Sequence, residues 1–215
     1  MSSPATINRW IWPESDEERA SAMSAQHGFP PAFARVLLAR GLVVDRAIEV
    51  FLNPRLGTLS DPMELPGIAA AVERLWRAVD CGERIVIFGD FDCDGITSSA
   101  LLQKLLMSMG ANVAVFLPDR LTEGYGFSSD ALRRCIALNR PSLIVTVDCG
   151  TNDVESVELA HELGAEVIVT DHHEVSEDPA SPFAMVNSRQ FKAQEVSSLA
   201  GVGVVFKLCH ALLRA

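Results

Sequence analysis

Residues 84–97 read "RIVIFGDFDCDGIT": an apolar run is followed at once by three aspartates on alternate positions, Asp90, Asp92 and Asp94. The run "RIVIF" is typical of a buried strand. Carboxylates this close repel one another and raise each other's pKa unless a positive charge lies between them. We therefore expect a metal ion at the end of this strand, with further ligands supplied by other parts of the chain.

On both sides of this strand, apolar runs alternate with amphipathic helical patterns. Runs rich in Val and Ile that alternate with such helices are typical of a mostly parallel sheet with helices on both faces, an α/β fold. The predicted strands are residues 84–90, 112–118, 142–148, 166–171 and 183–187. The predicted helices are residues 68–80, 97–110, 128–139 and 152–164, and another begins within "LAGVGVVFKLCHALLRA". For helix 97–110, Thr97 or Ser98 is the predicted N-cap and Gly110 the predicted end.

The residues before the first of these units follow a different pattern. Prolines separate short helical patterns such as "PAFARVLLAR" and "DRAIEVFLN", and proline ends or kinks a helix. We therefore expect a short helical N-terminal extension over residues 1–66, followed by one α/β domain over residues 67–215.

Acidic or imidazole side chains end three of the predicted strands. After the strand that carries Asp90, the next such strand ends in "VDCG", with Asp148, and another ends in "TDHH", with Asp171, His172 and His173. The carboxyl ends of parallel strands meet at one edge of a sheet, where ligands bind. Carboxylates and imidazoles without thiolates suit Mn²⁺ or Mg²⁺. Two such ions, about 3.5–4 Å apart, generate a hydroxide and hold a phosphoryl group for in-line displacement.

Two other interpretations of "DFDCDG" fit the sequence less well. D-x-D-x-D-G also opens the calcium loop of an EF-hand, whose twelfth position is Glu. Counted from Asp90, that position is Leu101, and the motif follows a strand rather than a helix. Phosphatases of the haloacid dehalogenase type carry D-x-D-G-T after a strand and use an aspartate nucleophile. Here Ile96 stands between Gly95 and Thr97, and that fold does not require "TDHH".

The composition is that of an ordinary globular protein, since 48% of the 215 residues are hydrophobic and 21% are charged. The net charge of −10 argues against a module that only coats nucleic acid, because phosphate neutralisation drives such binding. Five cysteines without a CxxC pair indicate reduced thiols rather than disulfides or a zinc site. We see no signal-peptide pattern and no apolar stretch long enough for a membrane span, so we expect a cytoplasmic protein.

Taken together, these motifs resemble those of the DHH phosphoesterases, and within them the RecJ type of single-strand-specific exonuclease. The resemblance covers roughly residues 29–215. Three letters such as "DHH" are a weak signal alone, but six segments match in order. They are "FLNPRLGTLSDPMELPGIAAAVERL" (51–75), "IVIFGDFDCDGITSSALL" (85–102), "PDRLTEGYGF" (118–127), "LIVTVDCG" (143–150), "VIVTDHHE" (167–174) and "LAGVGVVFKL" (199–208).

The resemblance implies a centre of two Mn²⁺ or Mg²⁺ ions that cleaves single-stranded DNA from its 5′ end and releases mononucleotides, in DNA repair and recombination. It implies that Asp90 and Asp92 hold the first ion and that Asp148 bridges the two ions. Asp94 and His172 would hold the second ion. Two divalent cations would then neutralise the like charges that "DFDCDG" brings together.

The same resemblance assigns roles around the ions. His173 would contact the scissile phosphate and Asp171 would orient a neighbouring histidine from behind, so that these two residues and Asp148 form the expected catalytic set. Arg120 matches a position near the DNA 5′ end, where a guanidinium can grip a terminal phosphate. Tyr125 is expected to stack on a base. A surface arginine and an aromatic that anchors a turn are the alternatives for these last two residues.

The sequence departs from the family pattern after "GVGVVF" (201–206). The resemblance implies a fourth-motif aspartate beyond this helix and then a further domain that helps to close the DNA channel, and neither has a match in this chain. We therefore expect the catalytic part of a longer enzyme, weakly active or inactive alone. "GVGVVF" itself is not a full G-x-G-x-x-G and predicts close helix packing rather than nucleotide binding.

Two alternatives stay open for the function. One is a DHH phosphodiesterase that acts on short oligonucleotides or cyclic dinucleotides, and the other is a non-catalytic module that retains the fold. The expected partners of a RecJ-type enzyme are single-stranded DNA and repair proteins such as a helicase or a single-strand-binding protein.

Overall fold

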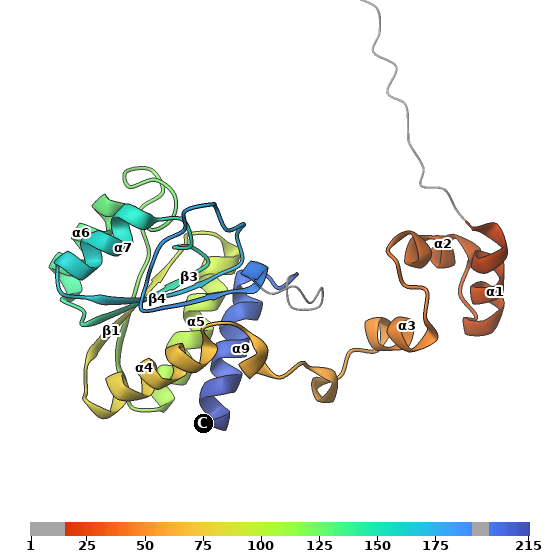
Figure 1. Ribbon diagram of the computed structural model, residues 1–215, viewed down its shortest axis with the longest axis horizontal. Coiled ribbons are helices and arrows are strands. Elements are labelled where there is room, and N and C mark those ends of the chain that lie inside the picture. The colour runs from red at the N-terminus through yellow and green to blue at the C-terminus, as the bar shows by residue number, and fades with distance from the viewer. Residues whose placement is uncertain (1–15, 191–197) are drawn as a thin grey trace, which may run out of the picture. The chain divides into compact units, whose positions relative to one another are not determined.

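The computed structural model describes residues 16–190 and 198–215, and the chain divides between Leu59 and Ser60 into two compact units (Figure 1). The first unit is helical, as the sequence predicts. Its helices are α1 (Glu17–His27), α2 (Pro31–Ala39) and α3 (Asp45–Leu52). They enclose a small core of Ala20, Met23, Ala34, Leu37 and Ile48.

The division lies earlier than the boundary at residues 66 and 67 that the composition suggests. Leu65 is buried in the core of the second unit, and the buried ammonium group of Lys207 donates hydrogen bonds to the carbonyl and hydroxyl oxygens of Ser60, at 2.6 and 2.8 Å. These contacts attach the short helix η2 (Pro62–Glu64) to the second unit. They join residues 147 positions apart, so no local sequence pattern indicates them.

The second unit is an α/β fold built on a five-stranded parallel sheet, as predicted. Its strands run in the order β2-β1-β3-β4-β5. They are β1 (Arg84–Gly89), β2 (Asn112–Phe116), β3 (Leu143–Val147), β4 (Glu166–Asp171) and β5 (Ala184–Asn187). The helices are α4 (Ile68–Asp80), α5 (Cys93–Ser108), α6 (Ser129–Asn139), α7 (Val154–Glu162) and α9 (Gly201–Arg214), with short turns η1 (Leu56–Thr58) in the first unit and η3 (Ser188–Gln190) after β5.

Helices cover both faces of this sheet, which explains why successive residues in the middle of its strands are mostly apolar. In β1, Ile85 and Ile87 belong to a core shared with α4, α5 and α9, whereas Val86 and Phe88 belong to a second core shared with α6 and α7. Figure 1 shows these two groups of helices on opposite sides of the strands. Burial of successive residues on opposite faces is what a continuous Val/Ile run predicts.

The strand order reverses beside β1, and this places the candidate site. The chain runs from β1 through α5 to β2 on one side, and then returns to form β3 on the other side of β1. In parallel sheets ligands bind outside the carboxyl ends of the strands at such a reversal. The register pairs Gly89 with Val147, so the next residue of each strand, Asp90 and Asp148, leaves the sheet at the same level.

The predicted start of the helix after β1 is wrong. Helix α5 begins at Cys93 rather than near Thr97, and Asp92 is its N-cap. One carboxylate oxygen of Asp92 accepts hydrogen bonds from the backbone N–H groups of Asp94 and Gly95, at 2.9 and 3.0 Å. An aspartate taken only as a metal ligand therefore also starts the helix, and Asp94 lies in its rigid first turn.

Two features of the described residues agree with the composition. All five cysteines are free thiols. No helix within the described ranges is long and apolar enough to cross a bilayer.

A pair of glycines tests how tightly α4 is seated on β5. Gly67 and Gly82 both have positive φ, 78° and 64°, but a Cβ at Gly67 would lie 2.1 Å from the carbonyl oxygen of Met185, whereas a Cβ at Gly82 would meet nothing within 4 Å. We expect Gly82→Ala to lower the free energy of unfolding by about 1–2 kcal/mol, the strain of a left-handed residue. Gly67→Ala should cost about 1–3 kcal/mol more, because the backbone of β5 must move. Urea unfolding followed by circular dichroism measures both, and equal losses would contradict the tight α4–β5 contact.

Candidate metal centre

Asp90 and Asp148 form the floor of the site at the carboxyl edge of the sheet. Asp90 is fully buried and Asp148 is 2% exposed. One oxygen of Asp90 accepts a hydrogen bond from the N–H of Phe91 at 2.7 Å. Among the described residues, no donor makes a hydrogen bond to the other oxygen of Asp90, Oδ2, although this atom is buried. The buried Oδ1 of Asp148 accepts no backbone hydrogen bond from these residues, and its neighbour is Nε2 of His172, 3.1 Å away. Asp148 also holds a left-handed backbone, with φ of 65°, a strain that is found mostly at functional sites.

The electrostatics of these two carboxylates favour a cation. Burial raises the pKa of Asp148 to about 8, and the charges of Asp94 and Asp92 contribute to this shift in the same direction. Burial also raises the pKa of Asp90, with a contribution from Asp92. Burial of a carboxylate oxygen that accepts no hydrogen bond costs free energy. A cation between these side chains would bind that oxygen and also cancel the repulsion between the carboxylates.

The ligand atoms gather into two groups that share one residue. Asp90, Asp92 and Asp148 place one oxygen each within 4.8 Å of one another, and Asp148, His172 and His173 do the same with one ligand atom each. Carboxylate oxygens and imidazole nitrogens without a thiolate suit Mn²⁺ or Mg²⁺. The residues present therefore fit two neighbouring cations with Asp148 between them, and the first group is the set that the sequence assigned to the first ion.

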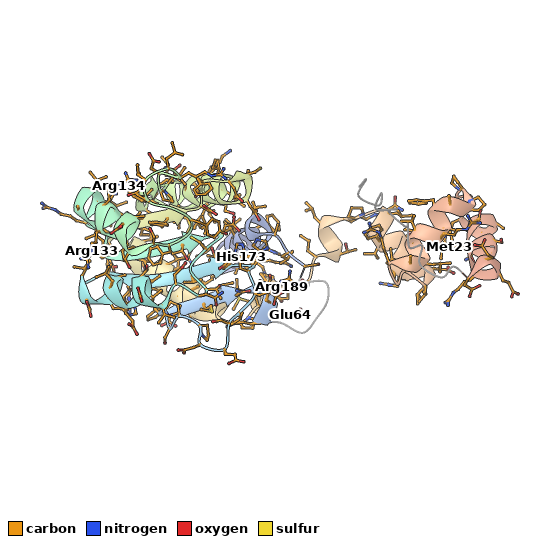
Figure 2. All side chains as sticks on the ribbon, turned by 90° about the horizontal axis from the view of Figure 1, so that it is seen from above. Met23, Glu64, Arg133, Arg134, His173 and Arg189 are labelled. Atoms are coloured by element: carbon orange, nitrogen blue, oxygen red, sulfur yellow. The ribbon has the colours of Figure 1, made fainter. Side chains whose placement is uncertain are left out.

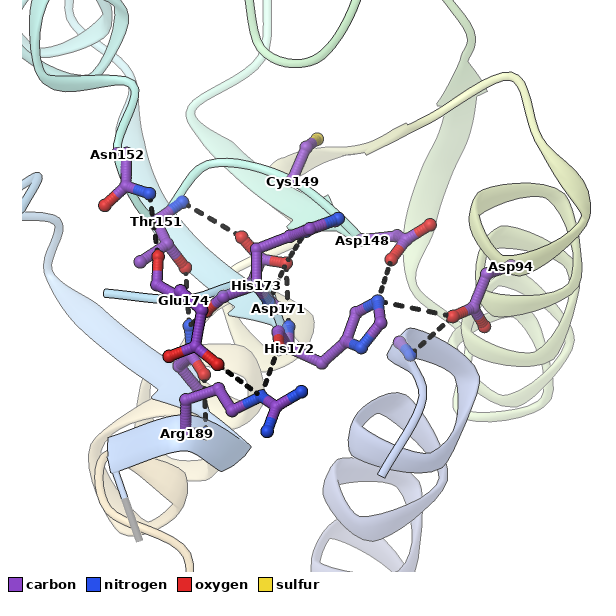
Figure 3. A network of polar contacts seen from close by, with 12 residues as sticks. Asp94, Asp148, Cys149, Thr151, Asn152, Asp171, His172, His173, Glu174 and Arg189 are labelled. Carbon is purple, nitrogen blue, oxygen red and sulfur yellow. Dashed lines mark hydrogen bonds and ion pairs between the residues drawn. The ribbon is translucent and has the colours of Figure 1, made fainter. Parts of the chain in front are cut away.

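Asp94 lies beside the second group but is already bonded to α9. Its Oδ2 accepts a hydrogen bond from the N–H of Gly201 at 2.6 Å, and its Oδ1 accepts one from Val202 at 2.8 Å. His172 Nε2 lies 3.6 Å from Asp94 Oδ2 and 3.1 Å from Asp148 Oδ1 (Figure 3). The structure thus brings together the three residues that the sequence assigned to the second ion. Both carboxylate oxygens of Asp94, however, already accept hydrogen bonds from the first turn of α9.

Asp171 organises the "DHH" turn at the end of β4. Its Oδ1 accepts hydrogen bonds from the N–H of His172 and from Nδ1 of His173, both at 2.7 Å, and its Oδ2 accepts one from the N–H of Thr151 at 3.2 Å. Burial acts to raise the pKa of Asp171, but the hydrogen bonds from Thr151 and His173 outweigh it and the pKa is lowered. For His173, burial acts to lower the pKa, and the hydrogen bond with Asp171 outweighs it and raises the pKa. Asp171 therefore fixes the orientation of His173, with Nε2 facing away.

The two residues predicted to contact DNA lie on one loop beside His173. The hydroxyl of Tyr125 is 3.2 Å from Nε2 of His173, and its ring, 61% exposed, meets Phe91 edge-on with 6.1 Å between the centroids. The guanidinium of Arg120 lies 5.0 Å above the centre of the Phe91 ring. Burial of the hydroxyl raises the pKa of Tyr125, so the phenol stays neutral. Phe91, which the sequence did not single out, connects the two predicted residues.

Two further residues that the sequence did not single out lie beside the "DHH" turn: Asn187, the last residue of β5, and Arg189 in η3. The side-chain N–H₂ of Asn187 donates to the hydroxyl of Thr151 at 2.8 Å and to the carbonyl of His173 at 3.0 Å. Nε of Arg189 donates to the carbonyl of His172 at 3.2 Å, and Arg189 lies close to His173 in two views of the molecule (Figure 2, Figure 3). The strand-end rule points to this position too, but "FAMVN" ends in an uncharged amide and gave no signal of charge.

Comparisons with known proteins show what this chain resembles. Residues 84–215 match the model of the DHH family, N-terminal domain. The chain is 37% identical to the single-stranded-DNA-specific exonuclease RecJ of Bacillus subtilis (strain 168), over 97% of this chain and 27% of the relative. It resembles a crystal structure of exonuclease RecJ bound to manganese (36% identity, TM-score 0.64, 70% of this chain and 38% of that one). It also resembles RecJ in complex with Mn²⁺ from Thermus thermophilus (28% identity, TM-score 0.70, 92% of this chain and 27% of that one). The chain thus spans well under half the length of each.

The contact between Asp171 and His173 can be tested by titration of the imidazole. We expect Asp171→Asn to lower the pKa of His173, because the charge that favours the imidazolium is lost while burial still disfavours it. Two-dimensional NMR of the histidine rings across pH measures this in the metal-free protein. The ring signals of His27, in the other unit, are the internal reference. An unchanged or higher pKa of His173 would show that Asp171 does not control it.

The raised pKa of Asp148 predicts how metal-free stability varies with pH. An unfolded aspartate titrates near pH 4, whereas Asp148 in the folded protein titrates at about 8. Between these values the folded state binds more protons, so its free energy of unfolding falls as pH rises from about 4 to about 8. Asp148→Asn removes this contribution, and the variant should therefore be more stable than the wild type at pH 8 in a chelator, on the order of a few kcal/mol. Urea unfolding at pH 5 and pH 8 measures it; a variant less stable than the wild type at pH 8 would contradict the burial of charge at Asp148.

Proposed function

Because this chain belongs to the DHH family, whose N-terminal-domain model matches residues 84–215, we propose that its second unit is the catalytic part of a RecJ-type exonuclease. The proposed reaction is hydrolysis of phosphodiester bonds in single-stranded DNA, from the 5′ end, with release of mononucleotides. The observation that carries this proposal is the sharing of Asp148 by two groups of ligand atoms at the edge of the sheet.

Each of the two ions is assigned its own set of ligands, and Asp148 belongs to both sets. We assign Asp90, Asp92 and Asp148 to one Mn²⁺ or Mg²⁺ ion, and Asp148 and His172 of the second group to the other. Asp94, 3.6 Å from Nε2 of His172, takes the place of His173 as the third ligand of that ion. When bound, such a pair of ions lowers the pKa of a water molecule and neutralises the charge of a phosphoryl group. Two buried oxygens support this assignment. Oδ2 of Asp90 accepts no hydrogen bond from the described residues, and Oδ1 of Asp148 faces His172, which is assigned to the same ion, at 3.1 Å.

His173 is assigned to the scissile phosphate. Asp171 holds Nδ1 of this ring at 2.7 Å, which leaves Nε2 as the atom that faces a substrate. Because Asp171 raises the pKa of His173, Nε2 can carry a proton and donate a hydrogen bond to a phosphate oxygen. The hydroxyl of Tyr125 lies 3.2 Å from Nε2 and positions the imidazole before the substrate binds. A phosphate oxygen would share or replace this contact of Nε2.

The loop that carries Arg120 and Tyr125 is assigned to the DNA strand. The guanidinium of Arg120 lies over the ring of Phe91. It can bind a phosphate with two parallel hydrogen bonds. The exposed ring of Tyr125 can stack on a base, a contact that tolerates any sequence. Arg189 adds a second guanidinium on the "DHH" side. These arginines and the ions would offset the net charge of −10 where the strand binds.

Several features of the proposal rest on the likeness to RecJ alone. They are the 5′ polarity, the mononucleotide product, a place in DNA repair and recombination in the cytoplasm, and partners such as a helicase or a single-strand-binding protein.

A nuclease assay tests the proposed reaction. The chain is incubated with Mn²⁺ and single-stranded DNA that carries a 5′ label, next to an Asp148→Asn variant that excludes a contaminating enzyme. Because the chain matches only part of the length of its relatives, we expect slow release of labelled mononucleotide by the wild type. The variant should lose at least about a further 100-fold, because residues that only orient a metal ligand already contribute about 10- to 100-fold. Duplex DNA of the same sequence should be cut far more slowly.

Other outcomes of this assay would point to the alternatives. A clear preference for dinucleotides over longer strands would indicate a phosphodiesterase for short oligonucleotides. Binding of Mn²⁺ that depends on Asp148, without hydrolysis of any of these substrates, would indicate a non-catalytic module. Equal activity of wild type and variant would contradict a role for Asp148 in catalysis.

A further inference from the structure

Helix α9 has no N-terminal cap of its own. Its N-cap residue is Ala200, which has no side-chain hydrogen-bonding group, and the first N–H groups of a helix need an acceptor. The acceptor is the carboxylate of Asp94, 107 residues earlier in the chain, which bonds Gly201 at 2.6 Å and Val202 at 2.8 Å (Figure 3). Charged capping groups are also favoured by the partial positive charge of a helix N-terminus.

The same end of α9 touches the shared ligand Asp148. A Cβ added to Gly201 would lie 2.6 Å from Oδ1 of Asp148 and 3.0 Å from its Cβ. Only a glycine leaves the Asp148 side chain in its present place. Gly203, two residues further along the helix, would meet only the flexible side chain of Leu199, at 3.2 Å or more. The close packing that "GVGVVF" predicts is therefore a contact with the site itself.

From these contacts we propose that Asp94 is a positioning residue that caps α9 and docks the helix against the metal centre, so that binding of the ions and docking of α9 stabilise each other. The inference goes beyond the proposed function, since a metal ligand needs no helix bond, and its second half rests on the proposed metal centre. Each carboxylate oxygen has two lone pairs, so Asp94 Oδ2 can keep its bond to Gly201 while it faces His172, 3.6 Å away.

The cap and a simple ligand make opposite predictions for the metal-free protein. If Asp94 were only a ligand, removal of its charge would relieve repulsion from Asp92 and Asp148 and raise the melting temperature. If Asp94 is a cap, the substitution Asp94→Asn leaves one backbone N–H of α9 facing an amide N–H₂ group and lowers the melting temperature. The matched variant is Asp148→Asn, which removes a charge from the same cluster but caps no helix. An asparagine Oδ1 can still accept a hydrogen bond from Nε2 of His172, 3.1 Å from Asp148 Oδ1.

The first experiment compares these two variants in a chelator at pH 8. We expect Asp94→Asn to lower the melting temperature by about 2–4 °C, a typical loss for part of a cap in a protein of this size, and Asp148→Asn to raise it. Hydrogen exchange at the N–H groups of Gly201 and Val202 should quicken about tenfold in Asp94→Asn alone. A rise in melting temperature for both variants, with unchanged exchange, would overturn the cap.

The second experiment measures binding of Mn²⁺ alone by calorimetry. Gly201→Ala should weaken it at least about tenfold, because the new Cβ displaces Asp148, whereas Gly203→Ala on the same helix should leave it unchanged. Equal affinities for the two variants would overturn the docking of α9 on the metal centre. If the wild type binds no Mn²⁺, the proposed metal centre fails and the coupling fails with it, while the exchange result still decides the cap.

Discussion

Repulsion among aspartates at one edge of the sheet is the constraint around which the rest of the second unit is arranged. Some of these carboxylates are satisfied by backbone N–H groups: Asp92 by the start of α5 and Asp94 by the start of α9. Within the described ranges, Asp90 keeps one buried oxygen without a hydrogen-bond donor, and a buried oxygen of Asp148 faces His172, 3.1 Å away. Backbone N–H groups thus stabilise part of the carboxylate cluster, and the neighbouring carboxylate oxygens of Asp90 and Asp148 form a site suited to a cation.

The parallel sheet is what brings these groups to one place. The register of β1 and β3 pairs Gly89 with Val147, so Asp90 and Asp148 emerge side by side where the strand order reverses. Two helices, α5 and α9, begin at this edge, and their N-termini carry partial positive charge toward the carboxylates. Asp94 in the first turn of one helix caps the other, so that the two helices on one face of the sheet are tied together at the site.

Local patterns in the sequence predict most of this arrangement and miss the contacts between distant residues. Val/Ile runs identify the strands because burial on both faces removes polar positions, and the strand-end rule brings Asp90, Asp148 and His172 together from three separate segments. The start of α5 was missed because Asp92 was interpreted as a ligand, although an aspartate is also a favourable N-cap. The hydrogen bonds between Asp94 and Gly201 and between Lys207 and Ser60 join residues more than a hundred positions apart. Such contacts exist only after the chain has folded.

The pairing of two cation positions across Asp148 is open to direct observation. Crystals of the protein grown with Mn²⁺ and measured near the manganese absorption edge would locate each ion by its anomalous scattering. We predict two peaks at the carboxyl edge of the sheet, one beside Asp90 and Asp92 and one beside His172, with the carboxylate of Asp148 contacting both. A single peak, or two peaks of which only one touches Asp148, would contradict a shared two-ion centre.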